Sequence, residues 1–219
     1  MQDLSITQEY FICALNEKGR ISGLSTEKLV CLVAAGLLEM QLENCITINK
    51  KEVNVTGELP AGRDYLKPLY DYINQSKAVK IEKIMEAYNY SFTDKRLDEL
   101  VGAIGNSLTM LGLVETAQAG LLGGKKSYIP KKNTINGVID MVRAELLENG
   151  EVTDDVAALV VLLDKSKSIN KYFSEFERKE INTKLTAIIN SPNGNMVKSM
   201  VEHVNNMISI MLVLMVAYS

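Results

Sequence analysis

The sequence predicts a mainly α protein, a single globular helical domain around a buried apolar C-terminal helix with one or two small β-hairpins. Apolar residues recur at helical spacing along most of the chain, and strand-like alternation is confined to two short segments. A chain of 219 residues, of which 47% are hydrophobic and 23% charged, can bury a core of its own. No interdomain linker is evident, so residues 1–219 are expected to form one domain.

Helical spacing marks the predicted helices in chain order. The first i, i+3, i+4, i+7 pattern begins at Leu29, after a Ser25 or Thr26 that can cap the helix start. Further helices are predicted around residues 66–73, 81–88, 97–111, 135–146, 157–163, 169–176, 181–188 and 197–211. Residues 157–163 are apolar on every side, so their helix should be surrounded by other helices.

The run from Met207 to Tyr218 is apolar apart from Ser209. It is shorter than the ~20 residues that a bilayer-spanning helix needs. We therefore expect a helix buried in the middle of the protein rather than an anchor.

Two segments are typical of β-hairpins. Ile46–Ile48 and Val53–Val55 alternate apolar and polar residues on either side of a turn at residues 49–52. A second hairpin is predicted between Val114 and Ile129, with Gly123 and Gly124 near its turn. Each candidate follows a predicted helix.

Charge and cysteine usage limit the function classes. The formal net charge is −3, the opposite of what a protein that coats nucleic acid usually carries. Three widely spaced cysteines form no disulfide framework or zinc-ligand spacing, and are expected to be reduced core residues of a cytosolic protein. We expect no metal, no cofactor and no nucleic-acid partner.

Catalytic motifs are also lacking in the sequence. The only histidine, His203, lies among apolar residues, where a buried and satisfied side chain is expected. Gly120–Ser127 approaches a phosphate-binding loop, but Lys125 stands where that motif needs glycine. Asp154 and Asp155 are better explained as acids in the first turn of a helix. No catalytic residue is assigned, and an enzyme is not expected.

The second hairpin suggests contact with a membrane. Leu121 and Leu122 place two large apolar side chains beside a glycine turn, where a solvated turn would be polar. The flanking lysines, which could meet anionic head groups, are Lys125, Lys126, Lys131 and Lys132. The alternative from the residues alone is that the leucines pack on the body and the lysines form a solvated edge that deters strand pairing.

The order of segments resembles the Golgi phosphoprotein 3 family over nearly the whole chain. The similar phrases are Leu4–Glu9 running into Ala14–Gly19, Leu38–Glu39 with Ile46–Ile48, Leu59–Gly62, Ser107–Leu113, the helix at 157–163 and the apolar C-terminus. The resemblance implies a cytoplasmic, peripherally membrane-associated protein. Golgi members of that family bind phosphatidylinositol 4-phosphate, insert a hydrophobic hairpin and help retain glycosyltransferases.

The resemblance transfers unevenly to this chain. The membrane-inserting hairpin falls on Leu121 and Leu122, but family members hold the head group with a tryptophan and several arginines, and this chain has no tryptophan. The aligned arginine positions are Val33, Asp98 and Val101. Lys95 and Arg96 could place charge on a neighbouring face instead. The basic N-terminal extension of eukaryotic members is not matched, which indicates a bacterial-type member.

The sequence therefore favours a non-catalytic peripheral membrane protein that binds anionic, phosphoinositide-like lipid head groups through the lysine-flanked hairpin. One alternative is a protein-interaction scaffold, with protein clients or a homo-oligomer formed through the hairpin. Another is a winged-helix-like nucleic-acid binder without lipid affinity, although its recognition helix at residues 26–42 carries one lysine, Lys28, beside Glu27 and Glu39.

Overall fold

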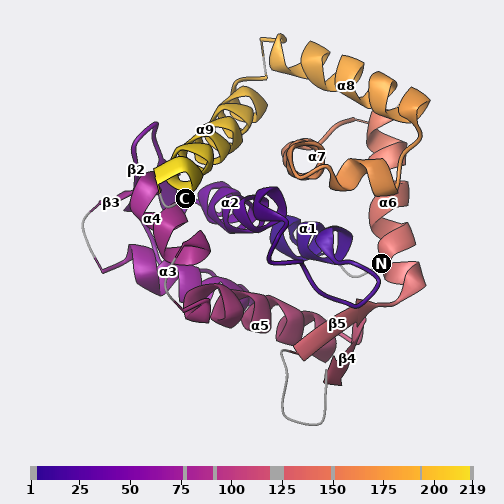
Figure 1. Ribbon diagram of the computed structural model, residues 1–219. Coiled ribbons are helices and arrows are strands. Elements are labelled where there is room, and N and C mark those ends of the chain that lie inside the picture. Colours follow the sequence, from indigo (N-terminus) through magenta and orange to yellow (C-terminus); the bar gives the residue numbers. More distant parts are fainter. Residues whose placement is uncertain are drawn as a thin grey trace.

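Helices make up most of the described chain and the strands are short and antiparallel, which confirms the predicted fold class (Figure 1). The computed structural model describes residues 4–75, 78–90, 93–118, 126–148, 151–192 and 194–217. The α-helices are α1 (Ile6–Ala14), α2 (Thr26–Leu42), α3 (Lys67–Ile73), α4 (Ile81–Asn89), α5 (Lys95–Met110), α6 (Lys132–Leu146), α7 (Asp154–Lys165), α8 (Glu175–Ile189) and α9 (Asn195–Ala217). Two short 3-10 helices are η1 (Asp64–Leu66) and η2 (Ser168–Lys171). The strands are β1 (Ile46–Ile48), β2 (Glu52–Val55), β3 (Val79–Lys80), β4 (Val114–Gln118) and β5 (Lys126–Pro130).

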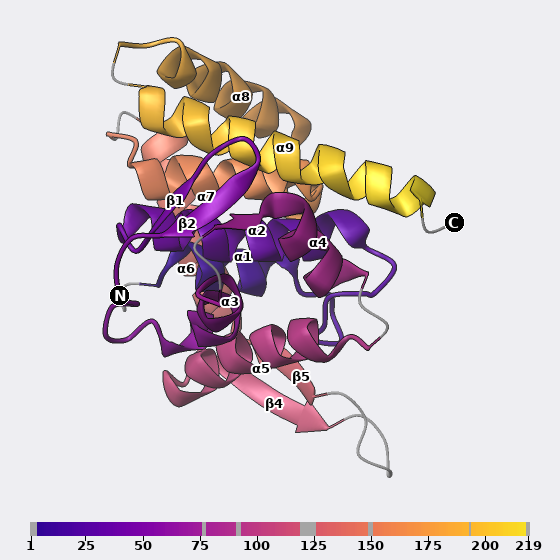
Figure 2. The same cartoon turned by 90° about the vertical axis from the view of Figure 1, so that its left-hand side faces the viewer.

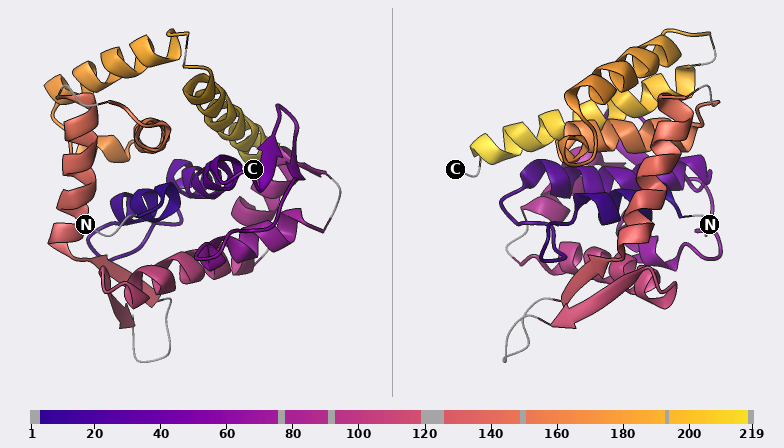
Figure 3. Two further views of the ribbon diagram at one scale, coloured as in Figure 1. Left: turned by 180° about the vertical axis from the view of Figure 1, so that it is seen from behind. Right: turned by 90° about the vertical axis from the view of Figure 1, so that its right-hand side faces the viewer.

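The centre of the molecule is formed by α1, α2 and α7. Figure 1 shows these three helices inside a ring of the other elements, and the view from behind in Figure 3 shows α6 and α8 on the outer side of α7. Every residue of α1 is buried, as are residues 30–40 of α2 and 156–163 of α7. The enclosed helix expected at residues 157–163 is therefore confirmed.

The burial of α2 bears on the winged-helix alternative. A recognition helix must present a polar, exposed face to base edges in a groove. In α2 the eleven residues from Val30 to Met40 are all buried against the rest of the protein. Over these residues α2 presents no such face and so lacks the exposure that a recognition helix needs.

The apolar C-terminal helix lies in the ring rather than in the middle of the protein. One face of α9, with Met207, Met211 and Leu214, packs on α2, α4, α7 and α8, while Val213 and Val216 are exposed. The helix is longer than the apolar run at its end, and among the described residues it alone is long and apolar enough to cross a bilayer. The expected central position is wrong because α1, α2 and α7 already fill the centre.

Both predicted hairpins form, with one strand that the sequence did not indicate. β1 pairs with β2 across the expected turn, and β4 pairs with β5. β3 adds a third strand beside β2, with Val79 opposite Val53. A two-residue strand is too short to show alternation, which explains why the sequence pattern missed it.

Helix caps account for several of the helix starts. Ser5 and Ser174 each form a capping box, and Thr153 accepts a hydrogen bond at the start of α7 from the N–H of Val156. Asp154 and Asp155 fill the first turn of α7, as expected. Ser25 stands at the N-cap of α2 but makes no side-chain cap hydrogen bond, so that expectation is wrong.

The covering helices α6 and α8 are joined by a charged contact. Arg143 Nε lies 2.9 Å from Glu177 Oε1, and the Ser174 N–H donates to the other Glu177 oxygen at 2.7 Å. The backbone N–H of Ser174 and the Arg143 guanidinium together lower the pKa of the Glu177 carboxyl from 4.5 to about 2. An ionised carboxylate thus links the two helices that cover α7.

The three cysteines are buried and free, as expected. Burial raises the pKa of the Cys13 and Cys31 thiols to about 12. The Cys45 thiol donates to the Met40 carbonyl at 3.1 Å. All three thus behave as small core residues.

Candidate functional site

A cavity of about 710 Å³ lies beside β5 of the β4–β5 hairpin, toward the end where Lys126 pairs with Gln118. It is enclosed by the chain between α1 and α2 at residues 16–23, by one face of α5 and by β5. The lining includes apolar residues from α1, α2 and α5, among them Phe11, Leu29 and Val101. A concave, largely apolar site with a few polar groups is the usual form of a small-ligand site.

The segment at residues 16–23 is held in a tight turn by Asn16. The Asn16 side-chain oxygen accepts hydrogen bonds from the N–H groups of Lys18 and Arg20, at 2.9 and 3.2 Å. Gly19 has φ +67°, in the left-handed region that glycine tolerates best. In this turn Lys18 and Arg20, on either side of Gly19, both line the cavity.

The same turn is fixed to the hairpin through Tyr128. The Tyr128 N–H donates to the Gly19 carbonyl at 2.8 Å, and a Cβ at Gly19 would lie 2.7 Å from the Tyr128 carbonyl oxygen. The Tyr128 ring lies over Gly105 of α5, where a Cβ would come within 2.4 Å of the ring, and meets Phe11 edge-on at 5.9 Å. Two glycines therefore allow the turn, the strand and α5 to meet at one tyrosine.

Basic side chains stand on the hairpin side of the cavity and acids on the α5 side. Arg20 Nε donates to Ser127 Oγ at 2.8 Å, and Lys126 Nζ donates to Asn106 Oδ1 at 3.1 Å. Asp94 and Asp98, at the start of α5, also line the cavity. The site can hold a polar or anionic group against Arg20 and Lys126, with the carboxylates restricting how much negative charge fits.

The structure separates the hairpin lysines that the sequence grouped. Lys126 lies at the Gln118 end of β5 and lines the cavity, whereas Lys131 and Lys132 follow the other end of that strand. At about 3.3 Å per strand residue, Lys126 and Lys131 are about 16 Å apart along the chain. Leu121, Leu122 and Lys125, with Gly123 and Gly124, lie outside the described residues.

The basic pair at the start of α5 points away from the cavity. Lys95 Nζ is 3.9 Å from Glu99, and the Arg96 guanidinium lies over the Tyr72 ring at 5.1 Å. Neither residue lines the cavity, which α5 meets through Asp94, Asp98 and neighbouring apolar residues. Lys95 and Arg96 therefore do not supply its charge.

The three positions aligned with the family arginines do not all lie at the cavity. Asp98 and Val101 line the cavity, but Val33 is fully buried in α2. The cavity cations that sequence reasoning missed are Lys18 and Arg20. Just beyond the same turn, the Leu24 side chain is 96% exposed. The signal available in the sequence was the Asn-Glu-Lys-Gly-Arg phrase, in which a turn places basic residues around a glycine.

The only histidine, His203, lies outside the cavity. His203 is buried on α9, 3.1 Å from Ser199 Oγ, and burial lowers its pKa. This is the satisfied histidine that the sequence predicts. Within the described ranges, no three His, Cys, Asp or Glu side chains gather where they could hold a metal ion.

Comparison with known families gives a match over most of the chain. A sequence model described as Golgi phosphoprotein 3 (GPP34) matches residues 6–205, which include the turn at 16–23, α5 and the β4–β5 hairpin. Among curated proteins, none is similar enough to count as a match.

Proposed function

This chain belongs to the Golgi phosphoprotein 3 (GPP34) family, and from that premise we propose that it is a non-catalytic peripheral membrane protein that binds anionic lipid head groups. The ligand class is a phosphorylated, phosphoinositide-like head group, held in the cavity beside β5 of the β4–β5 hairpin. Leu121 and Leu122, in the segment that joins the two strands, are proposed to enter the interfacial region of the bilayer.

The observation that carries the proposal is the position of three cations around one cavity beside the hairpin. Lys18 and Arg20 reach it from the turn after α1, and Lys126 reaches it from the first residue of β5. Guanidinium and ammonium groups are the usual partners of phosphate oxygens. A head group in this cavity would thus be bound next to the segment that carries the leucine pair.

The acids of the cavity set the expected strength of binding. Asp98 stands where family members carry a pocket arginine, and Asp94 lies one turn before it. A carboxylate close to a phosphate disfavours binding, because like charges repel. We therefore expect weaker binding than an arginine-lined pocket would give. We also expect the cavity to accept only head groups that carry a small number of negative charges.

A flotation assay with vesicles tests the proposal. The vesicles are phosphatidylcholine alone, or phosphatidylcholine with phosphatidylserine or phosphatidylinositol 4-phosphate. The full chain should float with the anionic vesicles at low salt, less at high salt, and best with the phosphorylated lipid. If the wild-type chain ignores all anionic vesicles at low salt, the proposed function is wrong.

Charge reversals then locate the site. Lys126→Glu and Arg20→Glu should each weaken binding about tenfold, since each places a negative charge where a phosphate is held. Lys95→Glu changes the net charge equally at an exposed position outside the cavity, and should have a much smaller effect. Leu121→Asp with Leu122→Asp should release the protein from vesicles. Equal losses for Lys95→Glu and Lys126→Glu would show that only overall charge matters and would remove the cavity from the proposal.

Self-association through the hairpin and recruitment of protein clients stay predictions. Measuring mass in solution for the wild type and the leucine variant separates the first of these from lipid binding. A hairpin variant that becomes smaller in mass and also stops floating would indicate that an oligomer is the membrane-binding form.

A further inference from the structure

The free end of α9 carries apolar side chains that no described element covers. Leu212, Val213 and Val216 are 57%, 67% and 80% exposed, whereas Met211 and Leu214, on the other face of the helix, are buried. The sequence from His203 to Ala217 contains no acidic or basic residue other than that histidine. The end of α9 extends beyond the neighbouring helices in Figure 2.

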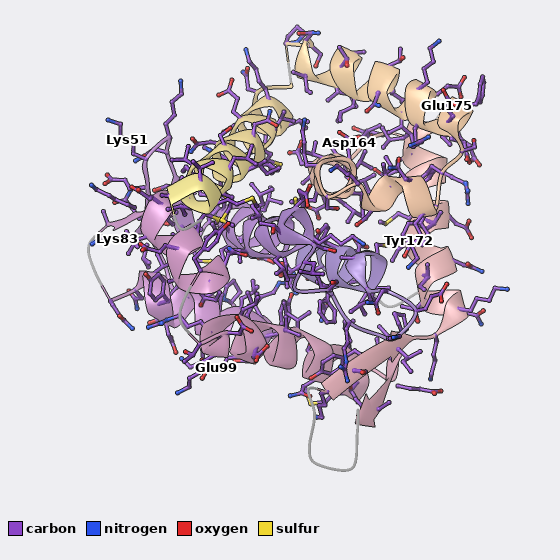
Figure 4. All side chains as sticks on the ribbon, viewed as in Figure 1. Lys51, Lys83, Glu99, Asp164, Tyr172 and Glu175 are labelled. Carbon is purple, nitrogen blue, oxygen red and sulfur yellow. The ribbon has the colours of Figure 1, made fainter. Side chains whose placement is uncertain are left out.

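Three lysines border this apolar end. A cleft of about 350 Å³ lies between α9 and the β1–β2–β3 sheet, and its walls include Lys50, Lys51 and Lys80 together with Val213. All three lysines are exposed, and Lys51 points away from the body in Figure 4. Among the described residues that line the cleft, Glu82 is the single acid. The balance of charge beside the apolar end is therefore positive.

The lysine-bearing turn is held in place against α9. Asn206 Nδ2 donates to the Lys50 carbonyl at 2.8 Å, a contact between residues 156 positions apart. Lys80 is opposite Glu52 in the sheet register, so β3 is tied to the same turn. The arrangement of cations beside the helix is thus built by tertiary contacts and does not depend on the end of α9 itself.

The end of α9 and the Gln118–Lys126 end of the hairpin face the same side of the molecule. In Figures 2 and 3, the arrow of β4 and the C-terminal end of α9 both point to that side. One flat surface could therefore meet both. From Ile210 to Ala217, α9 rises about 10 Å, which is comparable with the 5–10 Å depth to which interfacial helices enter a bilayer.

We infer that the exposed end of α9, with Lys50, Lys51 and Lys80, is a second contact with an anionic bilayer surface. The apolar residues enter the interfacial region and the lysines meet lipid phosphates at its edge. The inference rests on the proposed function, because it assumes a membrane-bound protein, but it uses a separate site. A second copy of the chain fits less well, since a two-fold contact through this surface would bring the lysine clusters of both copies into one interface.

The test uses the lack of tryptophan in this chain. Val216→Trp places a single fluorophore at the exposed end of α9, and Phe176→Trp places one at a position of α8 that is 69% exposed. With phosphatidylcholine–phosphatidylserine vesicles, the emission of the first should shift to the blue, and that of the second should not change. The double change Lys50→Glu with Lys51→Glu, added to Val216→Trp, should weaken vesicle binding at low salt. The lipid concentration needed for half of the blue shift should rise about tenfold.

The outcomes separate the two proposals. If Val216→Trp shows no shift while the protein still floats through its hairpin, the second contact is wrong and the proposed function stands. If the shift persists in the Leu121→Asp and Leu122→Asp variant, the α9 contact stands without the hairpin. A blue shift that follows protein concentration without vesicles would show that a second copy covers the end of α9, and would overturn the inference.

Discussion

The helices α7 and α9 are both strongly apolar, yet they lie in different surroundings. From Val156 to Leu163, no residue of α7 is more than 2% exposed, because α1, α2, α6 and α9 pack around it. Near the end of α9, each turn carries both buried and exposed apolar residues, such as the buried Leu214 beside the exposed Val213. Apolar composition therefore tells which residues can be buried, but the neighbouring elements decide which residues are buried. The apolar residues left exposed on α9 need a different explanation from those of α7.

The largest expected effect comes from shortening a side chain in α7. Leu162→Ala should lower the free energy of unfolding by roughly 2–5 kcal/mol, because it removes buried methyl groups and leaves a cavity. Urea unfolding followed by circular dichroism measures the change. A loss no larger than that of the same substitution at Leu212 of α9 would remove the distinction between the two helices.

A smaller effect is expected where the helices that cover α7 are joined. Glu177→Gln removes the charge between α6 and α8 and should cost about 1 kcal/mol or less, since the contact is partly exposed. The lowered pKa means that the ionised carboxyl stabilises the fold above pH 4.5, and this contribution is lost as the pH falls toward about 2.

Unfolding by urea at a series of pH values checks this dependence. The difference between the wild type and Glu177→Gln should be full at neutral pH and shrink below pH 4.5. Glu175→Gln, on the same turn of α8, is the matched control for the loss of one carboxylate. A difference that stays constant down to pH 2 would contradict the assigned contact.

The smallest effect is expected for Leu212→Ala on α9. Its side chain is 57% exposed, so the free energy of unfolding should change by about 0.5 kcal/mol or less. The same variant should weaken vesicle binding, if the end of α9 contacts lipid. A large loss of stability in the absence of vesicles would instead show that this residue is covered in solution.

Much of the fold could be predicted from the sequence, and the position of α9 shows where that prediction fails. Helical spacing and the two hairpins follow from local pattern, and the enclosure of α7 follows from its lack of a polar face. The sequence of α9 allowed the same conclusion, but burial depends on what packs against a helix, which local pattern does not contain. β3 was missed because two residues carry no periodicity.

The candidate site was only partly visible in the sequence. The hairpin and Lys126 were expected, but Lys131 and Lys132 lie at the other end of β5, and Lys95 and Arg96 face away from the cavity. Lys18 and Arg20 come from a turn more than 100 positions before the strand that they meet. The packing of Tyr128 on Gly105 and Gly19 brings these segments together, supported by the hydrogen bonds from Arg20 to Ser127 and from Lys126 to Asn106. No spacing along the chain encodes these contacts.

The burial of all three cysteines has a practical consequence for labelling. Thiol reagents attack the thiolate, and Cys13 and Cys31, enclosed in the centre with a pKa of about 12, hold almost none of it at neutral pH. Cys45 is 1% exposed. A spin label or dye should therefore react almost entirely with one new surface cysteine in the otherwise unaltered chain, without prior removal of the native thiols.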